Sequence, residues 1–155
     1  MQPRVSKRLV LAALVFLLSA CSKPGVSETV ITDDFGAGDG KRWRVVNYWA
    51  TWCGPCILEI AELNKIALDY RQQLVVLGVN FDNPLTESER EAAIAKMDIH
   101  FPVYAQDPAN ELGIDRPLVL PTTFIFSPDG VLVETLVGPQ TVETLLTVIR
   151  SQGRG

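Results

Sequence analysis

The chain has 155 residues, with 14 Lys and Arg against 18 Asp and Glu, which gives a formal net charge of −4. This acidic balance, without any run of basic residues, offers no surface for nucleic acid, so we expect no nucleic-acid partner. Hydrophobic residues make up 47% of the chain, which is enough for one domain with a proper core.

Residues 1–20 are predicted to be a signal peptide. Basic residues at positions 4, 7 and 8 precede an unbroken apolar run at 9–18. This run is too short to span a bilayer core, which needs about 20 residues, but it is typical of a secretory signal. Ala20 fits the position before an ordinary cleavage site, whereas Leu18 does not fit two positions earlier.

The tetrapeptide Leu18-Ser19-Ala20-Cys21 resembles the lipobox of bacterial lipoproteins. The resemblance implies cleavage before Cys21 and lipidation of that cysteine, which also removes the odd thiol from an exported chain. Several acyl chains hold a protein stably on a membrane. We therefore expect the periplasmic side of a bacterial membrane, inner or outer, with a slight lean to the outer because Ser22 follows. A retained N-terminal anchor and plain secretion with a free Cys21 are the alternatives.

Residues 21–40 are predicted to be a lipidated tether with an edge strand at Thr29–Thr32, and residues 41–155 to be the folded domain. Hydrophobic periodicity and turn signals predict the elements of that domain. In chain order they are a strand at 44–49, a helix to about 71, a strand at 74–81, a helix capped by Thr86 to about 97, a strand at 101–104, a helical turn at 107–112, a hairpin of strands at 122–126 and 131–137, and a helix after Thr141. This order predicts an α/β fold with a mixed central sheet and helices on both faces.

The segment Cys53-Gly54-Pro55-Cys56 lies where a buried strand is predicted to end and a helix to begin. A thiol at a helix N-terminus faces unpaired N–H groups and the positive end of the helix dipole, so its pKa falls. The resulting thiolate is the form that attacks disulfides. The pair is therefore predicted to be a redox-active disulfide, with no other cofactor.

Other interpretations of the cysteine pair stay open. Zinc normally takes four ligands, and beyond the pair the chain offers only Cys21 and His100. A structural disulfide is also conceivable, but closing so short a loop removes little entropy from the unfolded chain. Two soft thiolates could hold Cu(I), although neither Met97 nor His100 is near them in sequence. We predict no resident metal site, and for His100 a surface position without a catalytic role.

Three segments together resemble the thioredoxin superfamily, and within it the exported, membrane-tethered TlpA/ResA branch. They are Val45–Cys56 (VVNYWATWCGPC), the loop Leu120-Pro121-Thr122, and the Pro128-Asp129-Gly130 turn. The resemblance covers about residues 28–152. It implies a thioredoxin-like fold and a thiol–disulfide oxidoreductase.

The resemblance also implies roles for single residues. Cys53 corresponds to the exposed attacking thiol, Cys56 to the buried resolving thiol, and Glu59 to a carboxylate that assists proton transfer. Pro121 corresponds to a cis-proline that offers backbone to an extended substrate. The residues expected to contact the substrate are Trp52, Gly54, Pro55, Leu120 and Pro121.

The sequence departs from thioredoxin proper at several positions. Asn47 replaces a buried aspartate that accepts the proton of the resolving thiol, so acid–base help must come from Glu59 or water. Ala61 replaces a helix proline, so a helix kink is expected to be weaker or absent. The segment 113–120 before Pro121 is longer than usual and is expected to alter the wall of the substrate groove.

The TlpA/ResA resemblance implies a lipid-anchored reductant of disulfides in exported proteins, such as clients of cytochrome c or copper-site maturation. The exported side oxidises thiols, so a transmembrane thiol electron donor is expected to recharge the protein. The alternatives are a periplasmic disulfide oxidant and a Cu(I)- or thiol-binding protein. A peroxidase of related fold needs a lone nucleophilic cysteine in a Thr-containing loop, which the sequence lacks.

Overall fold

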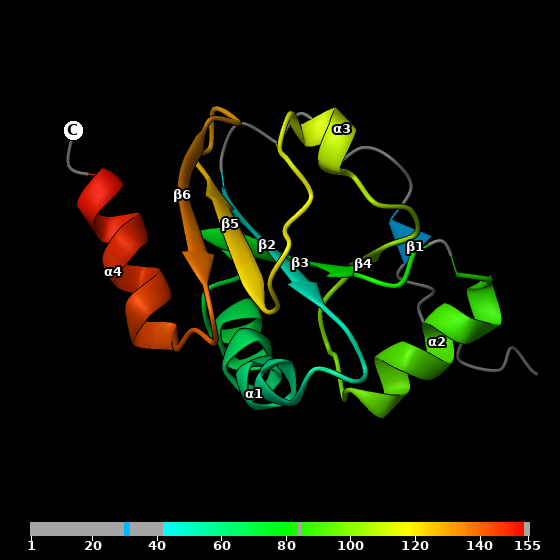
Figure 1. Cartoon of the computed structure of the whole chain (residues 1–155). Coiled ribbons are helices and arrows are strands. Elements are labelled where there is room, and N and C mark those ends of the chain that lie inside the picture. The colour runs from blue at the N-terminus through cyan, green and yellow to red at the C-terminus, as the bar shows by residue number, and fades with distance from the viewer. Residues whose placement is uncertain (1–29, 32–41, 84, 154–155) are drawn as a thin grey trace, which may run out of the picture.

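The computed structural model describes residues 30–31, 42–83 and 85–153. Figure 1 shows the elements, which follow the predicted order. They are β1 (Val30–Ile31), β2 (Trp43–Trp49), α1 (Gly54–Asp69), β3 (Leu74–Asn80), α2 (Glu87–Lys96), β4 (Val103–Tyr104), α3 (Ala109–Leu112), β5 (Thr122–Phe126), β6 (Leu132–Val137) and α4 (Val142–Gln152). The predicted signal peptide, Cys21 and most of the predicted tether lie outside the described residues.

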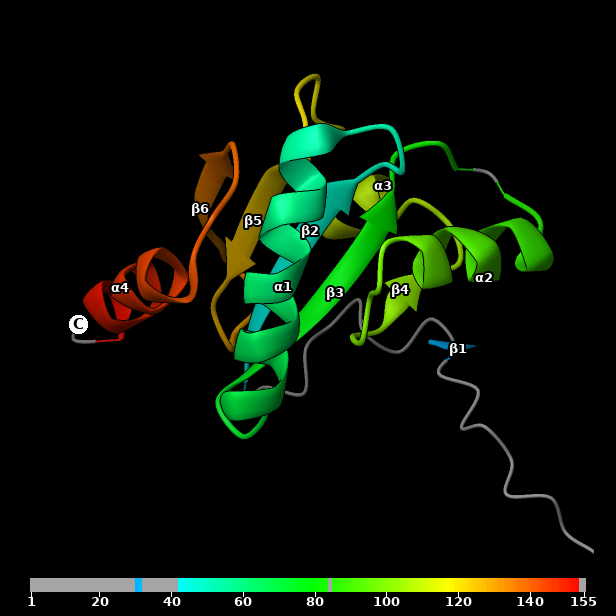
Figure 2. The ribbon, with the colours of Figure 1, turned by 90° about the horizontal axis from the view of Figure 1, so that it is seen from below.

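The strands form one six-stranded sheet in the order β1-β4-β3-β2-β5-β6. The β1–β4, β4–β3 and β3–β2 pairs are parallel, whereas β5 runs antiparallel to β2 and β6 antiparallel to β5. The parallel β2–β3 and β3–β4 pairs need crossover connections, which α1 and α2 supply. Figure 2 shows α1 over one face of the sheet and α3 behind the other. The predicted α/β class, with a mixed sheet and helices on both faces, is confirmed.

The alternation of side chains along β2 builds a core on each face of the sheet. Val45 and Trp49 belong to the apolar cluster that includes residues of α1, α2 and α4. Val46 and Tyr48 belong to the cluster on the opposite face, beside α3. Successive residues of a strand point to opposite faces, so Asn47 points toward α1 from the middle of a buried strand. This polar residue on an apolar face marks the start of the candidate site.

The local end signals for the helices were predicted correctly. Thr86 and Glu89 form a reciprocal capping box at the start of α2, and Thr141 caps α4 through the backbone N–H of Thr144. Gly113 ends α3 with a positive φ of 65°, a conformation that glycine adopts without steric cost. Among the described residues, none of the helices has the length and apolar character needed to cross a membrane.

The strand expected at 101–104 is shortened to Val103–Tyr104. Pro102 has no N–H to donate to a neighbouring strand. It contributes only its carbonyl oxygen, which accepts a hydrogen bond from Gly78 N at 2.8 Å. The apolar pattern alone therefore overestimated the length of this strand.

Candidate active site

Cys53 and Cys56 are joined by a disulfide at the N-terminus of α1. Cys53 is the N-cap residue, and its Sγ accepts a hydrogen bond from Cys56 N at 3.2 Å. Gly54 and Pro55 form the start of the first turn, where the missing N–H of proline leaves no hydrogen bond unmade. The first turn carries no acidic side chain, so the positive end of the helix dipole acts on Cys53 without local compensation. After reduction, this position favours a thiolate on Cys53.

The two sulfur-bearing residues differ in accessibility, but by less than expected. Cys53 keeps 5% of its surface exposed and Cys56 keeps none. The order of accessibility agrees with an attacking Cys53 and a resolving Cys56. The expectation of an exposed Cys53 is wrong for this oxidised structure, because its Sγ is bonded to Cys56 and lies against the first N–H groups of the helix.

Trp52 forms an aromatic rim next to Cys53. Its side chain is 64% exposed, and its Nε1 donates to both Asp82 carboxylate oxygens, at 3.2 and 3.1 Å. The indole meets the Phe81 ring edge-on, with the ring centroids 6.3 Å apart. The large exposed ring beside the disulfide is therefore held from two sides and does not swing freely.

Pro121 follows the lengthened segment 113–120, and the Leu120–Pro121 peptide bond is cis, as the resemblance implies. Pro121 is buried and its carbonyl accepts from Gly138 N at 2.9 Å. The Thr122 hydroxyl donates to Val119 O at 2.7 Å, closing the turn around the proline. In Figure 2 this loop lies at the same end of the sheet as the first turn of α1.

Glu59 is buried in the protein core, with 1% of its surface exposed. It lies three residues after Cys56, a spacing that places both side chains on one face of α1. Its Oε2 accepts from Asn47 Nδ2 at 2.9 Å, and its Oε1 accepts from Gln140 N at 3.0 Å and from the Thr123 hydroxyl at 3.4 Å. Asn47 Nδ2 also donates to Thr123 Oγ1 at 3.0 Å. The carboxyl group thus has protein donors in place of water.

The surroundings of Glu59 bring its protonation equilibrium close to neutral pH. Burial raises the pKa of the Glu59 carboxyl to about 7, although the hydrogen bonds from Gln140, Asn47 and Thr123 favour the ionised form and lower it. Asn47 has no ionisable proton. Near pH 7 the buried cluster therefore has a carboxyl group that can both accept and release a proton.

Two members of this buried cluster, Thr123 and Gln140, were not predicted from the sequence. Thr123 pairs in register with Asn47 across β2 and β5, a relation that only the sheet pairing reveals. Gln140 comes from the turn between β6 and α4, and its backbone N–H, not its side chain, contacts Glu59. A backbone donor leaves no signal in the sequence.

His100 lies apart from the site, as expected for a surface residue. Its Nε2 is 2.9 Å from Asp98 Oδ1, and both side chains are exposed. Across residues 42–83 and 85–153, no three His, Cys, Asp or Glu side chains are grouped so that they could hold a metal ion.

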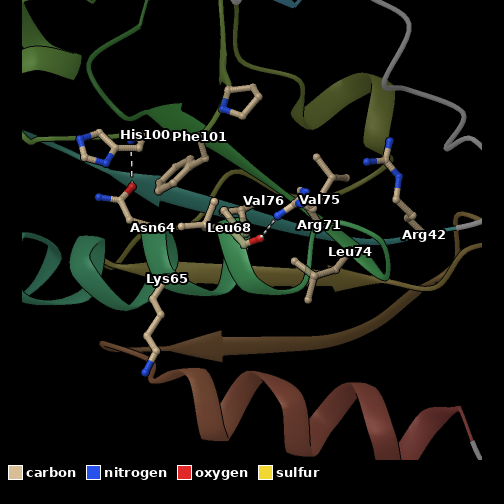
Figure 3. A pocket seen from close by; sticks show the side chains of 12 residues that line it. Arg42, Asn64, Lys65, Leu68, Arg71, Leu74, Val75, Val76, His100 and Phe101 are labelled. Atoms are coloured by element: carbon tan, nitrogen blue, oxygen red, sulfur yellow. Dashed lines mark hydrogen bonds between the residues drawn. The ribbon is translucent and has the colours of Figure 1, made fainter.

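A cavity of about 580 Å³ lies along the C-terminal half of α1 and the start of β3, and Figure 3 shows its lining. Leu68, Val75 and Phe101 contribute apolar surface, Arg71 donates to Leu68 O at 3.1 Å, and Lys65 points away. None of the predicted site residues lines this cavity.

A disulfide at the N-cap of a sheet-covering helix, together with a nearby cis-proline loop, defines a thioredoxin-like protein. Residues 18–135 match the AhpC/TSA family, and the chain belongs to this family.

Several curated relatives are named as thiol–disulfide oxidoreductases or thiol:disulfide interchange proteins. The chain is 32% identical to the thiol-disulfide oxidoreductase ResA of Bacillus cereus, over 64% of this chain and 57% of that protein. It is 30% identical to the thiol:disulfide interchange protein HelX of Rhodobacter capsulatus, over 69% and 58%, and 35% identical to DsbE of Allochromatium vinosum, over 61% and 51%. The matched region thus spans little more than half the length of these relatives.

Solved structures share the fold. StoA of Bacillus subtilis superposes with a TM-score of 0.58 at 21% identity, covering 70% of this chain and 82% of that one. The exposed lipoprotein thioredoxin Etrx1 of Streptococcus pneumoniae gives a TM-score of 0.59 at 21% identity, covering 72% and 86%. The predicted thioredoxin-like fold is confirmed.

Proposed function

We propose that this protein is a thiol–disulfide oxidoreductase that reduces disulfides in exported proteins. The observation that carries the proposal is the Cys53–Cys56 pair at the N-terminus of α1, with the buried Glu59 one helical turn further along. The names of ResA, HelX and DsbE, all thiol–disulfide oxidoreductases or interchange proteins, support it.

The reaction starts from the reduced pair and moves two electrons to the client. The Cys53 thiolate attacks one sulfur of the client disulfide, forming a mixed disulfide, while the other client sulfur leaves as a thiolate and takes a proton. The Cys56 thiolate then attacks Cys53 Sγ and breaks the mixed disulfide. The second client sulfur leaves as a thiolate and takes a proton, so the client departs as a dithiol and the Cys53–Cys56 disulfide remains.

Glu59 assists the second step by taking the proton of Cys56, directly or through water. Its pKa of about 7 leaves a large share of the carboxyl ionised at neutral pH, yet basic enough to accept a proton. The helix dipole acts chiefly on the N-cap residue Cys53, so Cys56 needs this separate help.

The client lies on the surface around the dithiol and the cis-proline loop. The residues proposed to contact it are Trp52, Gly54, Pro55, Leu120 and Pro121. This placement is supported by the exposure of three of these residues beside the disulfide, Trp52, Gly54 and Pro55.

The same proposal places the protein on the periplasmic side of a bacterial membrane. Residues 1–20 serve as the signal peptide, lipidated Cys21 is the anchor, residues 21–40 are the tether and residues 41–155 are the redox domain. Etrx1, a structural neighbour whose name describes it as an exposed lipoprotein, supports the anchoring. A transmembrane thiol carrier supplies the electrons, and the clients are exported proteins whose cysteines must be free to receive haem or copper.

Reduction of insulin by dithiothreitol, with and without the protein, tests the activity. We expect acceleration by the wild type and none by Cys53→Ser, which keeps the size of the side chain but cannot attack. A redox potential near that of thioredoxin, about −270 mV, is expected for a reductant. A potential of about −120 mV would make the protein an oxidant and not a reductant. Tight Cu(I) binding without any reduction of insulin would contradict the oxidoreductase function altogether.

A further inference from the structure

The lengthened loop 113–120 is fastened to the strand end beside the active site by its one basic residue, Arg116. The guanidinium lies over the Phe81 ring, with Cζ 4.1 Å from the ring centroid, and Nη2 donates to Phe81 O. Arg116 Nε also contacts Asp107 Oδ2 at 3.1 Å. One side chain therefore joins the loop to the residue just after β3 and to the segment before α3.

The partners of Arg116 are themselves held in place. Asp107 Oδ1 accepts from the Tyr48 hydroxyl at 2.6 Å and from Ala109 N at 3.0 Å. Burial and the contact with Asp107 raise the pKa of Tyr48, so the phenol stays a donor at neutral pH. Phe81 donates its backbone N–H to Trp49 O at 2.8 Å, and its ring meets the Trp52 indole. Arg116 thus contacts Phe81, and Phe81 in turn contacts Trp52, the residue before Cys53.

The part of the loop that follows Arg116 carries apolar side chains into solvent. Leu118 is 97% exposed and Val119 is 55% exposed. An isolated exposed leucine needs no explanation, but these two residues also line a groove of about 450 Å³. Leu132 and Val137 of β6 line the same groove and are exposed as well.

One end of this groove lies at the end of the sheet where the dithiol sits, and the groove runs along the sheet face opposite α1 as far as Leu132, which pairs with Phe126. Thr122, which lines it, pairs in register with Tyr48, and β2 ends one residue later at Trp49. Because Pro121 of the cis-proline loop directly precedes Thr122, a client bound at that loop can extend into this end of the groove. An apolar side chain near the client disulfide finds apolar walls there.

We propose that Arg116 is a positioning residue that holds the loop 113–120 as one wall of an apolar subsite, and that Leu118 selects clients with apolar residues beside their disulfide. This inference rests on the proposed oxidoreductase function. A planar guanidinium can stack and donate at the same time, which lysine cannot, so the contact with Phe81 is specific to arginine.

Two synthetic peptides, each with one disulfide, test the proposal. In one peptide leucines flank both cysteines, and in the other serines replace these leucines. For the wild type we expect a lower KM for the leucine peptide. Arg116→Ala and Leu118→Ser are each expected to raise that KM by about tenfold, with kcat within about twofold and the KM for the serine peptide unchanged.

A double-variant comparison separates positioning from an independent contact. If Arg116 acts by placing Leu118, the R116A/L118S variant is no worse than the poorer single variant. Effects that multiply across the two sites would overturn the positioning role. Arg116→Lys is expected to give a KM between those of the wild type and R116A.

Matched substitutions outside the groove control for general effects. Leu68→Ser changes an equally apolar side chain, 65% exposed on α1, and Arg90→Ala removes an arginine from α2. Both are expected to leave the KM for either peptide as in the wild type. If Arg116→Ala does not fold, Leu118→Ser still decides the matter, because a side chain that is 97% exposed contributes little to folding.

The outcomes distinguish this inference from the proposed function. A wild type that reduces neither peptide contradicts the oxidoreductase itself. A wild type that reduces both peptides with equal KM, or an L118S variant with an unchanged KM for the leucine peptide, overturns the apolar subsite and leaves the oxidoreductase intact.

Discussion

The Cys56→Ala variant is expected to accumulate a covalent mixed disulfide between Cys53 and its client, while catalytic turnover falls to background. Cys53 is the residue of the pair that solvent reaches and the one at the helix N-cap, so its attack does not need Cys56. The second step does need Cys56, because the fully buried thiol lies beneath Cys53 to displace the client. Non-reducing electrophoresis of the protein, incubated with a disulfide-containing client, reveals the trapped species.

The control for this experiment exchanges the two cysteines. Cys53→Ala leaves only the buried thiol, which a folded client cannot reach, so no trapped species is expected. Equal trapping by the two variants would contradict the assignment of attacking and resolving roles. Trapping only by Cys53→Ala would reverse them.

The Glu59→Gln variant is expected to change both the pH dependence of stability and the rate of the resolving step. In the unfolded chain Glu59 ionises near pH 4.5, whereas in the folded protein it ionises at about 7. Between these values the unfolded state releases the proton while the folded state keeps it, so the free energy of unfolding falls as the pH rises. The shift corresponds to a loss of roughly 3 kcal/mol between pH 4.5 and pH 7.

Glutamine cannot ionise, so this loss is expected to be absent in the Glu59→Gln protein. Denaturant unfolding of the oxidised proteins at pH 5 and pH 8 measures the difference. The Asn47 Oδ1 atom has no hydrogen-bond partner in the structure. A rotation of the Asn47 amide can therefore offer an acceptor to the new NH₂ group. Glu91→Gln, which removes an exposed carboxylate from α2, is the matched control and is expected to keep the slope of the wild type.

The kinetic effect of Glu59→Gln is expected in the resolving step alone. Loss of a general base typically slows a step by about 10²-fold or more. Rapid mixing of the reduced protein with excess client disulfide should show an unchanged rate of mixed-disulfide formation and a slower release of the reduced client. An unchanged release rate would contradict the role of Glu59 as a general base. A pH slope of stability like that of the wild type would show that the Glu59 carboxyl does not titrate as assigned.

Local signals in the sequence were sufficient to predict most of the fold. The capping box at Thr86 and the glycine after α3 depend on neighbours within a few residues, and the structure agrees with both. Periodicity also placed the cysteine pair at the start of α1, just after β2. The short strand β4 was overestimated because Pro102 interrupts the backbone pairing that the apolar pattern suggested.

The surroundings of the dithiol depend on contacts between distant parts of the chain, which no local signal reveals. Glu59 has the sequence context of an ordinary surface glutamate on a helix. Its burial follows from the packing of α1 against β5 and against the turn that carries Gln140, 81 positions later in the chain. Arg116 likewise looked like one polar residue in a long loop. Its role depends on Phe81 and Asp107, which the fold brings together.

The acidity of the Cys53 thiol is the property on which the proposed chemistry depends. The rate of alkylation of the reduced protein by iodoacetamide, followed from pH 4 to pH 10 in the Cys56→Ala variant, measures it directly. We expect an apparent pKa for Cys53 clearly below the ordinary cysteine value of about 8.5, because the helix N-terminus stabilises the thiolate. An apparent pKa at or above that value, or a thiol that resists alkylation throughout this range, would contradict a nucleophilic Cys53.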